Sequence, residues 1–389
     1  MSLNVVVVSE EFPPETGWGG LATYSRYLAR GLSRRGHTVT VIAGGETRRT
    51  VSVDGIRLIR LPTPTSVRPG SIGRIRSVLG RSRLVAEVIR KLKPDIVEAP
   101  EWKGEGLVST MRRSAPLTSR LHTPLDLLMK LGDLPYTFPN RVIGRLERLQ
   151  VRLSDGVTCS TAELLESLQS LHWFKKHVEI IPNFIDIQYL EHNLGSPKTL
   201  EIKDEQDDYL LYYGRLEWKK GVHLLASALP GFLRAHRDAK VILVGRDSGY
   251  GQSTMRAYLD AGLKGFRSQL HFTGFVEESE KIRLIANSRL VVLPSLWEGF
   301  GFSILEAMAL GKPVVTTPVG GIKTIVRGAE CAYLVPPNDA TALGDMLIRA
   351  WDDPGRHRVG NAARHRATSF SADSVVPLIE SHYADVISA

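Results

Sequence analysis

Two acidic residues with glycines between them form the most specific pattern in the sequence. Glu298 and Glu306 enclose seven residues, of which two are glycines. Glycine lets a backbone approach a ligand closely, and a helix that begins after the second glycine turns free N–H groups towards an anion. The acid beyond the helix start could accept hydrogen bonds from a diol such as ribose, and the acid before it could bind sugar hydroxyls. Either acid alone could simply cap a helix or face solvent, so the prediction depends on the whole arrangement. The residues expected at this site are Glu298, Gly299, Phe300, Gly301, Phe302, Ser303 and Glu306.

A pair of cationic residues lies in a second segment bounded by glycines. Arg215 and Lys220 belong to the run 214–221, directly after an apolar stretch, and Lys219 precedes the second of them. Arginine can bind two phosphate oxygens at once, and lysine supplies a compact charge. Taken alone, such a pair is more often a solvated surface. Beside the acidic pattern it favours a site for a diphosphate.

A third segment rich in glycine, residues 13–20, follows the first apolar stretch and ends in Gly19 and Gly20. It could be an ordinary turn between a strand and a helix. Its spacing is not the Gly-x-Gly-x-x-Gly of dinucleotide sites, because position 22 is Ala22, and this weighs against a nicotinamide-dependent oxidoreductase. His122, in the run Arg-Leu-His-Thr-Pro, ends another apolar stretch. A lone histidine there is usually just a satisfied polar residue.

Together these segments resemble the retaining glycosyltransferases of family GT4, which have the GT-B fold. The resemblance extends over nearly the whole chain, with motifs in a fixed order in both halves. It implies that Glu298 contacts the donor sugar and that Glu306 contacts the ribose of the nucleotide. It also implies that Arg215 and Lys220 hold the diphosphate.

The same resemblance implies roles for residues outside these two motifs. The Gly19–Gly20 loop would lie beside the donor phosphates, and His122 would contact the donor sugar, without being assigned as a general base. Phe275 and Val276 fall in a turn whose backbone would bind the nucleobase.

Two positions depart from the family pattern. Phe184 stands where a glycine is usual, which puts a positive φ there in doubt. The run 320–324 lacks the common Pro-Glu pair. This second departure could alter the donor pocket.

We predict that the reaction needs no metal ion and no cofactor. A departing diphosphate requires positive charge, supplied by a divalent ion or by the protein. The sequence has no Asp-x-Asp pair, the usual metal-bridging pattern of the other major glycosyltransferase fold. Arg215, Lys220 and the helix start near Phe302 would then supply the charge.

The elements that must position these residues alternate along the chain. Short β-branched stretches followed by helical periodicity predict a doubly wound, mostly parallel sheet in each half, and thus two Rossmann-like domains facing a central cleft. The predicted strands are 3–8, 38–43, 56–60, 95–98, a segment ending at 122, 209–213, 240–244, 270–273, 290–294 and 313–317. The predicted helices are 21–35, 72–93, 221–235, 278–287, 302–310 and an amphipathic helix near 371–389.

The domain prediction assigns residues 1–190 to an acceptor-binding domain and residues 191–370 to a nucleotide-sugar-binding domain. A polar segment at 183–208 is interpreted as the linker. The helix at 371–389 is expected to return to the first domain.

Composition restricts the class of protein further. The chain has 389 residues and two cysteines, which excludes a disulfide framework and favours a reducing cytoplasm. We expect no signal peptide, because the first strand lacks a basic start and a cleavage site. No apolar run approaches the roughly 20 residues that cross a bilayer.

The net charge of +9 comes from the first half, where residues 1–190 hold 27 Lys and Arg against 18 Asp and Glu. This excess of positive charge favours an anionic partner. Alternatively, it reflects only a soluble surface that is rich in arginine. The stretch 72–93 is basic and amphipathic, so it could lie on an anionic membrane, or it could cover the domain core. We expect no nucleic-acid partner.

Acceptor binding is expected near Glu98, Glu101 and Trp102, which end a strand of the first half, although Trp102 could simply be packed. The predicted activity is transfer of a sugar from a UDP-sugar, or secondly a GDP-sugar, to a glycan, lipid-linked or small-molecule acceptor. The predicted location is the cytoplasm, with contact at the inner face of the membrane left open. The alternatives are a sugar-nucleotide epimerase or phosphorylase on the same fold, a nicotinamide oxidoreductase, and a non-catalytic sugar-nucleotide-binding protein.

Overall fold

The structure is a computed structural model that divides the chain into two compact units. Unit 1 comprises residues 1–184 and 372–389, and unit 2 comprises residues 185–371. The structure describes residues 2–16, 19–63, 72–171, 173, 177–195, 208–248, 253–328 and 330–389. Residues 196–207 of the predicted linker therefore lie outside the described residues. Residues 185–190, which the sequence analysis assigned to the first domain, belong to unit 2.

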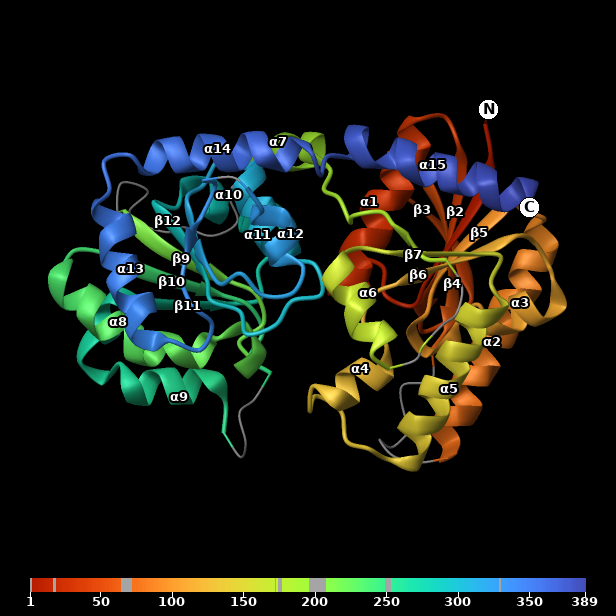
Figure 1. Ribbon diagram of the computed structural model, residues 1–389, viewed down its shortest axis with the longest axis horizontal. Helices are drawn as coiled ribbons and strands as arrows, with labels where there is room; N and C mark the ends of the chain where they lie inside the picture. Colours follow the sequence, from red (N-terminus) through yellow and green to blue (C-terminus); the bar gives the residue numbers. More distant parts are fainter. Residues whose placement is uncertain are drawn as a thin grey trace. The chain divides into compact units, whose positions relative to one another are not determined.

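Unit 1 is built on an eight-stranded sheet with the order β3-β4-β2-β1-β5-β6-β7-β8 (Figure 1). Its strands are β1 (Asn4–Ser9), β2 (Thr38–Gly45), β3 (Arg49–Val53), β4 (Ile56–Pro62), β5 (Ile96–Pro100), β6 (Leu117–Leu121), β7 (Gly156–Cys159) and β8 (Glu179–Ile180). All described pairs are parallel except β3 with β4. The central strands are almost continuously apolar, as a sheet covered on both faces requires.

Helices cover both faces of this sheet. They are α1 (Gly20–Arg34), α2 (Ile72–Leu92), α3 (Leu107–Arg112), α4 (Leu125–Lys130), α5 (Phe138–Leu153), α6 (Ala162–Gln169), α15 (Ala372–Ser388) and the 3-10 turn η1 (Trp102–Gly104). Right-handed crossovers that run in opposite directions along a sheet place their helices on opposite faces. Accordingly, α1 packs with α15 on one face, and α2, α3 and α5 pack together on the other (Figure 1).

The C-terminal helix α15 is fastened to unit 1 by buried polar contacts. The Tyr383 and Tyr24 hydroxyls donate hydrogen bonds to the two carboxylate oxygens of Glu98, each at 2.8 Å. The His382 ring contacts the Thr118 hydroxyl at 2.8 Å and the Glu179 carboxylate at 2.7 Å. These contacts join α15 to strands β5, β6 and β8.

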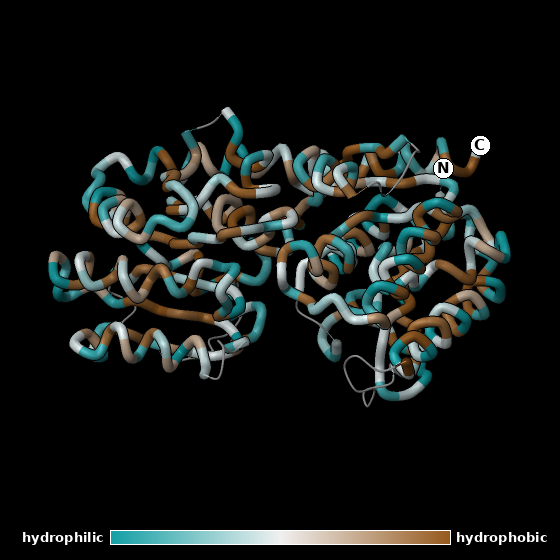
Figure 2. Tube along the Cα trace, turned by 60° about the horizontal axis from the view of Figure 1, so that its bottom comes forward, coloured by the Kyte–Doolittle hydropathy of each residue, from teal (hydrophilic) through white to brown (hydrophobic). Residues whose placement is uncertain are grey.

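Unit 2 contains a six-stranded parallel sheet with the order β11-β10-β9-β12-β13-β14. Its strands are β9 (Tyr209–Tyr213), β10 (Lys240–Val244), β11 (Leu270–Gly274), β12 (Leu290–Leu293), β13 (Val314–Thr316) and β14 (Tyr333–Leu334). Its helices are α7 (Ile187–Leu194), α8 (Val222–Ala235), α9 (Met255–Gly262), α10 (Glu278–Asn287), α11 (Phe302–Ala309), α12 (Ile322–Val326), α13 (Ala340–Asp352) and α14 (Arg356–Thr368), with 3-10 turns η2 (Trp218–Lys220) and η3 (Lys264–Gln269). Figure 2 shows hydrophobic residues concentrated on the central strands.

The predicted doubly wound sheets are confirmed, and each predicted strand or helix lies within a few residues of an observed one. Phe184, in place of the usual glycine, does not have a positive φ. Its ring is buried and packs against Tyr24, with ring centres 6.3 Å apart. The substitution therefore fills the core beneath α1.

Candidate functional site

The carboxyl edge of the unit 2 sheet brings together the predicted cationic and acidic motifs. The Lys220 ammonium lies 2.6 Å from a carboxylate oxygen of Glu298, and the Ser295 hydroxyl donates to the same oxygen at 3.0 Å. Lys220 ends η2 after β9, and Glu298 follows β12, so two adjacent strands supply the pair. Both side chains are mostly buried but retain some exposure, which leaves the pair reachable by a ligand.

Two glycines allow the loops that carry this pair to lie in contact. Gly221 has φ +67°, and a Cβ there would lie 1.9 Å from the Pro294 carbonyl oxygen. Gly320 has φ +48°, and a Cβ there would lie 1.9 Å from the Glu298 carbonyl oxygen. Because only glycine fits such contacts, these positions fix the backbone around Lys220 and Glu298. The run 320–324, which departs from the family pattern, therefore supports the Glu298 loop.

Arg215 and Lys219, the other two cations of the run 214–221, have different surroundings. Arg215 is largely exposed and pairs with Glu217 at 3.1 Å, so its guanidinium is not held against Glu298 in this structure. Lys219 lies over the Trp297 ring, 5.1 Å from its centre. Partial burial, together with the neighbouring charge of Lys220, lowers the pKa of Lys219 to about 8. A rise in pH through this value therefore removes the positive charge of Lys219.

The predicted helix start is observed. Gly301, with φ +112°, precedes α11, and the helix begins at Phe302 as expected. Phe300 packs against Phe302 and Phe370 and is almost fully buried, so at Phe300 only the backbone remains for a ligand. The Tyr213 hydroxyl donates to the Ser303 carbonyl oxygen and ties the first turn to β9.

Glu306 forms a buried ion pair that the sequence analysis missed. Its carboxylate lies 3.1 Å from the Lys281 ammonium, which also contacts Glu278 at 3.0 Å. Burial alone would lower the pKa of Lys281, but Glu278 and Glu306 outweigh it and raise that pKa. Lys281 therefore stays charged and fixes the orientation of Glu306. The spacing of Glu278 and Lys281 on one helix was the available signal.

The turn predicted to bind a nucleobase follows β11. Gly274 has φ +70°, Phe275 is 40% exposed, and Val276 is partly buried. The Arg246 guanidinium lies 4.7 Å from the centre of the Phe275 ring. Arg246 follows β10 at the same sheet edge, a position that could have identified it from the sequence.

In unit 1, His122 and Glu101 are in contact at the ends of β6 and β5. The His122 backbone N–H donates to a Glu101 carboxylate oxygen at 2.9 Å. Burial raises the pKa of Glu101 to about 8. Burial, aided by Arg120, lowers the pKa of His122 to about 3, so its imidazole is neutral at physiological pH. A neutral ring can both donate and accept a hydrogen bond.

The three residues predicted on the acceptor side differ in their surroundings. Glu98 is buried, and both its carboxylate oxygens accept hydrogen bonds from Tyr24 and Tyr383, so in this structure it serves the packing of α15. Trp102 packs partly buried against the apolar cluster between α2 and α5. Glu101 is fully buried as well. Glu98 and Glu101 are thus enclosed by the protein, whereas Trp102 keeps part of its surface exposed.

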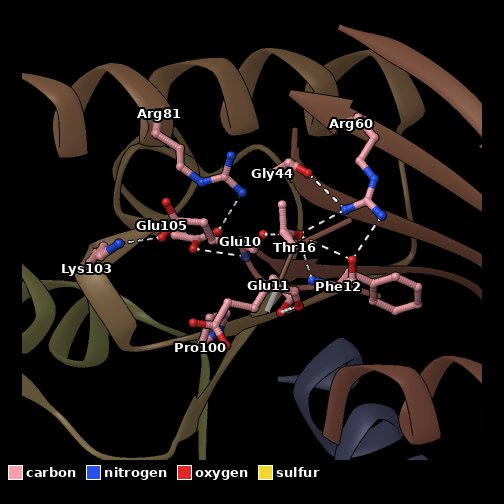
Figure 3. Close-up of polar contacts among 12 residues, drawn as sticks. Glu10, Glu11, Phe12, Thr16, Gly44, Arg60, Arg81, Pro100, Lys103 and Glu105 are labelled. Carbon is pink, nitrogen blue, oxygen red and sulfur yellow. Dashed lines mark hydrogen bonds and ion pairs between the residues drawn. The ribbon is translucent and has the colours of Figure 1, made fainter. Parts of the chain in front are cut away.

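The glycine-rich loop is anchored at its base by a buried arginine (Figure 3). Arg60 donates to the carbonyl oxygens of Gly44 and Phe12, each at 2.9 Å, and to the Thr16 hydroxyl at 3.1 Å. Gly19 caps the N-terminus of α1, and Gly20 is the first residue of that helix. Residues 17 and 18 lie outside the described residues. Sequence reasoning missed Arg60, which lies in β4.

A second cluster at the end of β1 combines two acids and two bases (Figure 3). Lys103 lies 2.6 Å from Glu10, and Arg81 lies 3.2 Å from Glu105. Glu105 also accepts a hydrogen bond from the Glu10 backbone N–H at 3.1 Å. The paired charges fix the path of the chain as it leaves β1.

Metal binding and membrane crossing each require a recognisable structural feature. Among these residues, no group of three or more His, Cys, Asp or Glu side chains is arranged to hold a metal ion. Within the same ranges, no helix combines the length and apolar character needed to span a bilayer.

Comparison with known proteins matches both halves of the chain. The family model of glycosyl transferases group 1 matches residues 199–366, and that of glycosyltransferase family 4 matches residues 18–189. An uncharacterized glycosyltransferase of Methanocaldococcus jannaschii is 28% identical, with 96% of each chain covered.

Solved structures match over the same extent. Sucrose-phosphate synthase of Thermosynechococcus elongatus has a TM-score of 0.80 at 19% identity, with 99% of each chain covered. HepE of Anabaena, solved in complex with UDP and glucose, has a TM-score of 0.71 at 20% identity, covering 98% of this chain and 99% of its own. These likenesses show the GT-B fold. With the motifs at the strand ends and both family models matched, the chain belongs to the group 1 glycosyl transferases of family 4.

Proposed function

We propose that the chain is a retaining, metal-independent glycosyltransferase that moves a sugar from a nucleotide-diphosphate donor to an acceptor hydroxyl. The observation that carries the proposal is the Lys220–Glu298 ion pair of 2.6 Å at the edge of the unit 2 sheet, beside the start of α11. A cation, a carboxylate and the backbone N–H groups of a helix start are the groups that a sugar diphosphate needs.

The roles of the unit 2 residues follow from these contacts. Phosphate oxygens of the donor would compete with Glu298 for Lys220, and Arg215 is exposed enough to turn towards the same oxygens. Glu298, released from Lys220, would then accept hydrogen bonds from sugar hydroxyls. Glu306, oriented by Lys281, would accept hydrogen bonds from the ribose diol. Phe275 and Arg246 offer flat surfaces for a base.

We propose substitution on one face of the sugar. The bond between the anomeric carbon and the diphosphate oxygen breaks, and its electron pair stays on the diphosphate. The acceptor oxygen bonds to the same face of that carbon and gives its proton to the departing phosphate oxygen. Lys220 and Arg215 stabilise the negative charge that develops there, so no metal ion is needed.

For the donor we propose a UDP-sugar, with a GDP-sugar second, and UDP in the Anabaena structure supports this order. Glycan, lipid-linked and small-molecule acceptors are all compatible with the fold, and contact of unit 1 with an anionic membrane would favour a lipid-linked one. We place the reaction in the cytoplasm, because both cysteines are free and buried.

The central test compares two adjacent lysines. Lys220→Ala should lower turnover of UDP-sugars by about 100- to 1,000-fold, the usual effect of removing one group that stabilises developing charge. Lys219→Ala removes the same charge one residue away, and we expect a much smaller loss. The measurement is release of UDP with formation of a glycosidic product, followed by anomeric assignment of that product by NMR.

Each of three results would contradict a different element of the proposal. Full activity of Lys220→Ala would exclude the phosphate assignment. Loss of activity in EDTA that manganese restores would exclude metal independence. An epimerised or phosphorolysed sugar, without a new glycosidic bond, would favour the rival activities.

A further inference from the structure

The outer stripe of α5 combines arginines with large apolar side chains. Residues three or four positions apart share one side of a helix, and five exposed residues of α5 follow this spacing. They are Phe138, Arg141, Arg145, Leu149 and Arg152. The one acid of α5, Glu147, is buried on the opposite side, where it accepts hydrogen bonds from backbone N–H groups.

The outer stripe of α2 has the same character. Ile72, Arg76, Arg83 and Arg90 are exposed at helical spacing, and Glu87 is the acid on this stripe. The opposite side of α2 packs on the unit 1 sheet through Val85 and its neighbours. Both outer stripes therefore point away from the sheet.

Helices α2 and α5 are neighbours, so the two stripes form one surface (Figure 1). Ile75 and Val78 of α2 pack with Ile143 of α5 in one apolar cluster. The Arg74 guanidinium donates to the Asn140 side chain at 2.6 Å and joins the helix starts. We call the exposed residues of the two stripes the basic helix face.

Apolar side chains are concentrated at one end of this face. Ile72 at the start of α2 is 64% exposed, Phe138 at the start of α5 is 65% exposed, and Tyr136 just before α5 is 68% exposed. The Asn140 side chain donates to the Pro135 carbonyl oxygen at 2.9 Å, which holds the Tyr136 segment against α5. Exposed aromatic and aliphatic side chains beside arginines are suited to the boundary between lipid headgroups and acyl chains.

The arginines of this face are available to an external anion. Arg141, Arg145 and Arg152 form no ion pair with any residue that the structure describes. A second copy of the chain that docked through the same face would meet the same positive charge and be repelled. A nucleic acid would match the charge and could stack on Tyr136 and Phe138, but the aliphatic side chains of Ile72 and Leu149 gain more from acyl chains than from bases.

We propose that the basic helix face binds an anionic lipid bilayer, with its arginines at the headgroups and Ile72, Tyr136 and Phe138 inserted below them. The contact attaches unit 1 to the bilayer surface, and no helix of the described residues crosses it. Membrane attachment is independent of glycosyl transfer, so each can be tested without the other.

The experiment measures co-sedimentation of the full chain with vesicles. One vesicle preparation is phosphatidylcholine, and the other contains equal amounts of phosphatidylcholine and phosphatidylglycerol. We expect binding to the second preparation only, with an affinity that falls as salt shortens the Debye length from about 10 Å to about 3 Å. Arg141→Glu with Arg145→Glu should weaken this binding by at least about 30-fold, because each arginine at an anionic surface contributes about five-fold.

A second variant tests insertion of the apolar side chains. Phe138→Ser should weaken binding by about thirty-fold, since a buried phenyl ring contributes on the order of 2 kcal/mol, while the salt dependence stays as in the parent. The charge control is Arg234→Glu with Arg237→Glu, two exposed arginines of unit 2 that change the net charge equally. This control should retain vesicle binding.

Several outcomes would overturn the proposal. Equal loss in the unit 2 control would mean that net charge alone causes binding. Equal binding to both preparations, or binding to neither, would also exclude it. A dimer that the Arg141 and Arg145 replacements dissociate would assign the face to a second copy. UDP release, measured without vesicles, should be unchanged in the Arg141 and Arg145 variant, which separates this result from failure of the proposed activity.

Discussion

At the scale of single residues, Glu101 shows how burial changes the chemistry of a side chain. Its carboxyl group is enclosed at the end of β5, with one oxygen bound by the His122 N–H. Its other oxygen has no hydrogen-bond partner among the residues that the structure describes. The neutral acid is therefore favoured, and the pKa of Glu101 rises to about 8 through burial. The sequence identified Glu101 as a candidate for acceptor binding, but it could not show that the Glu101 carboxylate binds the backbone N–H of His122.

The raised pKa of Glu101 predicts a specific dependence of stability on pH. Between the unfolded pKa near 4.3 and the folded pKa of about 8, the folded chain holds a proton that the unfolded chain lacks. Stability contributed by this group is therefore complete below that window and is lost across it as the pH rises. Glu101→Gln keeps an oxygen acceptor and does not titrate. As the pH rises across this window, the free energy of unfolding of this variant should therefore increase, relative to that of the parent, by up to about 1 kcal/mol per pH unit.

Urea unfolding at pH 5, 6.5 and 8 provides the measurement for this prediction, at roughly the two ends and middle of the window. Glu87→Gln, an exposed acid of α2, is the control and should show no such trend. If the free energies of unfolding of Glu101→Gln and the parent differ by the same amount at each pH, Glu101 is already ionised in the folded chain.

At the scale of elements, the loops after β9 and β12 lie in contact only because Gly221 has no side chain. Gly221→Ala would place a Cβ 1.9 Å from the Pro294 carbonyl oxygen in a backbone with φ +67°. We expect a loss of about 1–3 kcal/mol in stability, and a larger loss of turnover because Lys220 moves away from Glu298. The matched control is Gly231→Ala within α8, where a Cβ meets nothing within 4 Å. It should stabilise the chain by about 0.5–1 kcal/mol.

Unfolding midpoints and turnover of the two glycine variants, measured in parallel, check this prediction. Retention of both stability and turnover by Gly221→Ala would show that the two loops can separate without consequence.

Elements that bury a continuous apolar run could be predicted from the sequence, whereas contacts between distant segments could not. The strand of Val5 to Val8 and the helix start at Phe302 follow from local composition. By contrast, Glu98 seemed suited to a ligand because its partner Tyr383 lies 285 residues further along the chain. Strands β8 and β14 have two residues each, too few to show a periodicity. The pairing of Lys281 with Glu306 likewise depends on how α10 packs beside α11.

At the scale of the whole molecule, each unit has its own sheet and core, so a change in one should leave the other intact. Tyr383→Phe removes the hydroxyl by which α15 donates a hydrogen bond to Glu98 of β5. An unpaired buried carboxylate oxygen costs about 1–3 kcal/mol. We expect faster hydrogen exchange in β5, β6 and α15, and unchanged exchange in β9 to β12.

The control for this variant is Tyr136→Phe, an exposed tyrosine of unit 1, which should change exchange in neither unit. Faster exchange throughout unit 2 in Tyr383→Phe would show that the units do not unfold separately.

The contact of Tyr383 with Glu98 also has a consequence for biosynthesis. The ribosome completes the strands of unit 1 first, but it delivers α15 only after residues 185–371 have been translated. At about 5–20 residues per second, this interval lasts roughly 10–40 s. Throughout it the nascent N-terminal sheet lacks the helix that covers α1 and satisfies Glu98. The interval before α15 arrives is therefore when the newly made chain is most open to chaperone capture and to aggregation.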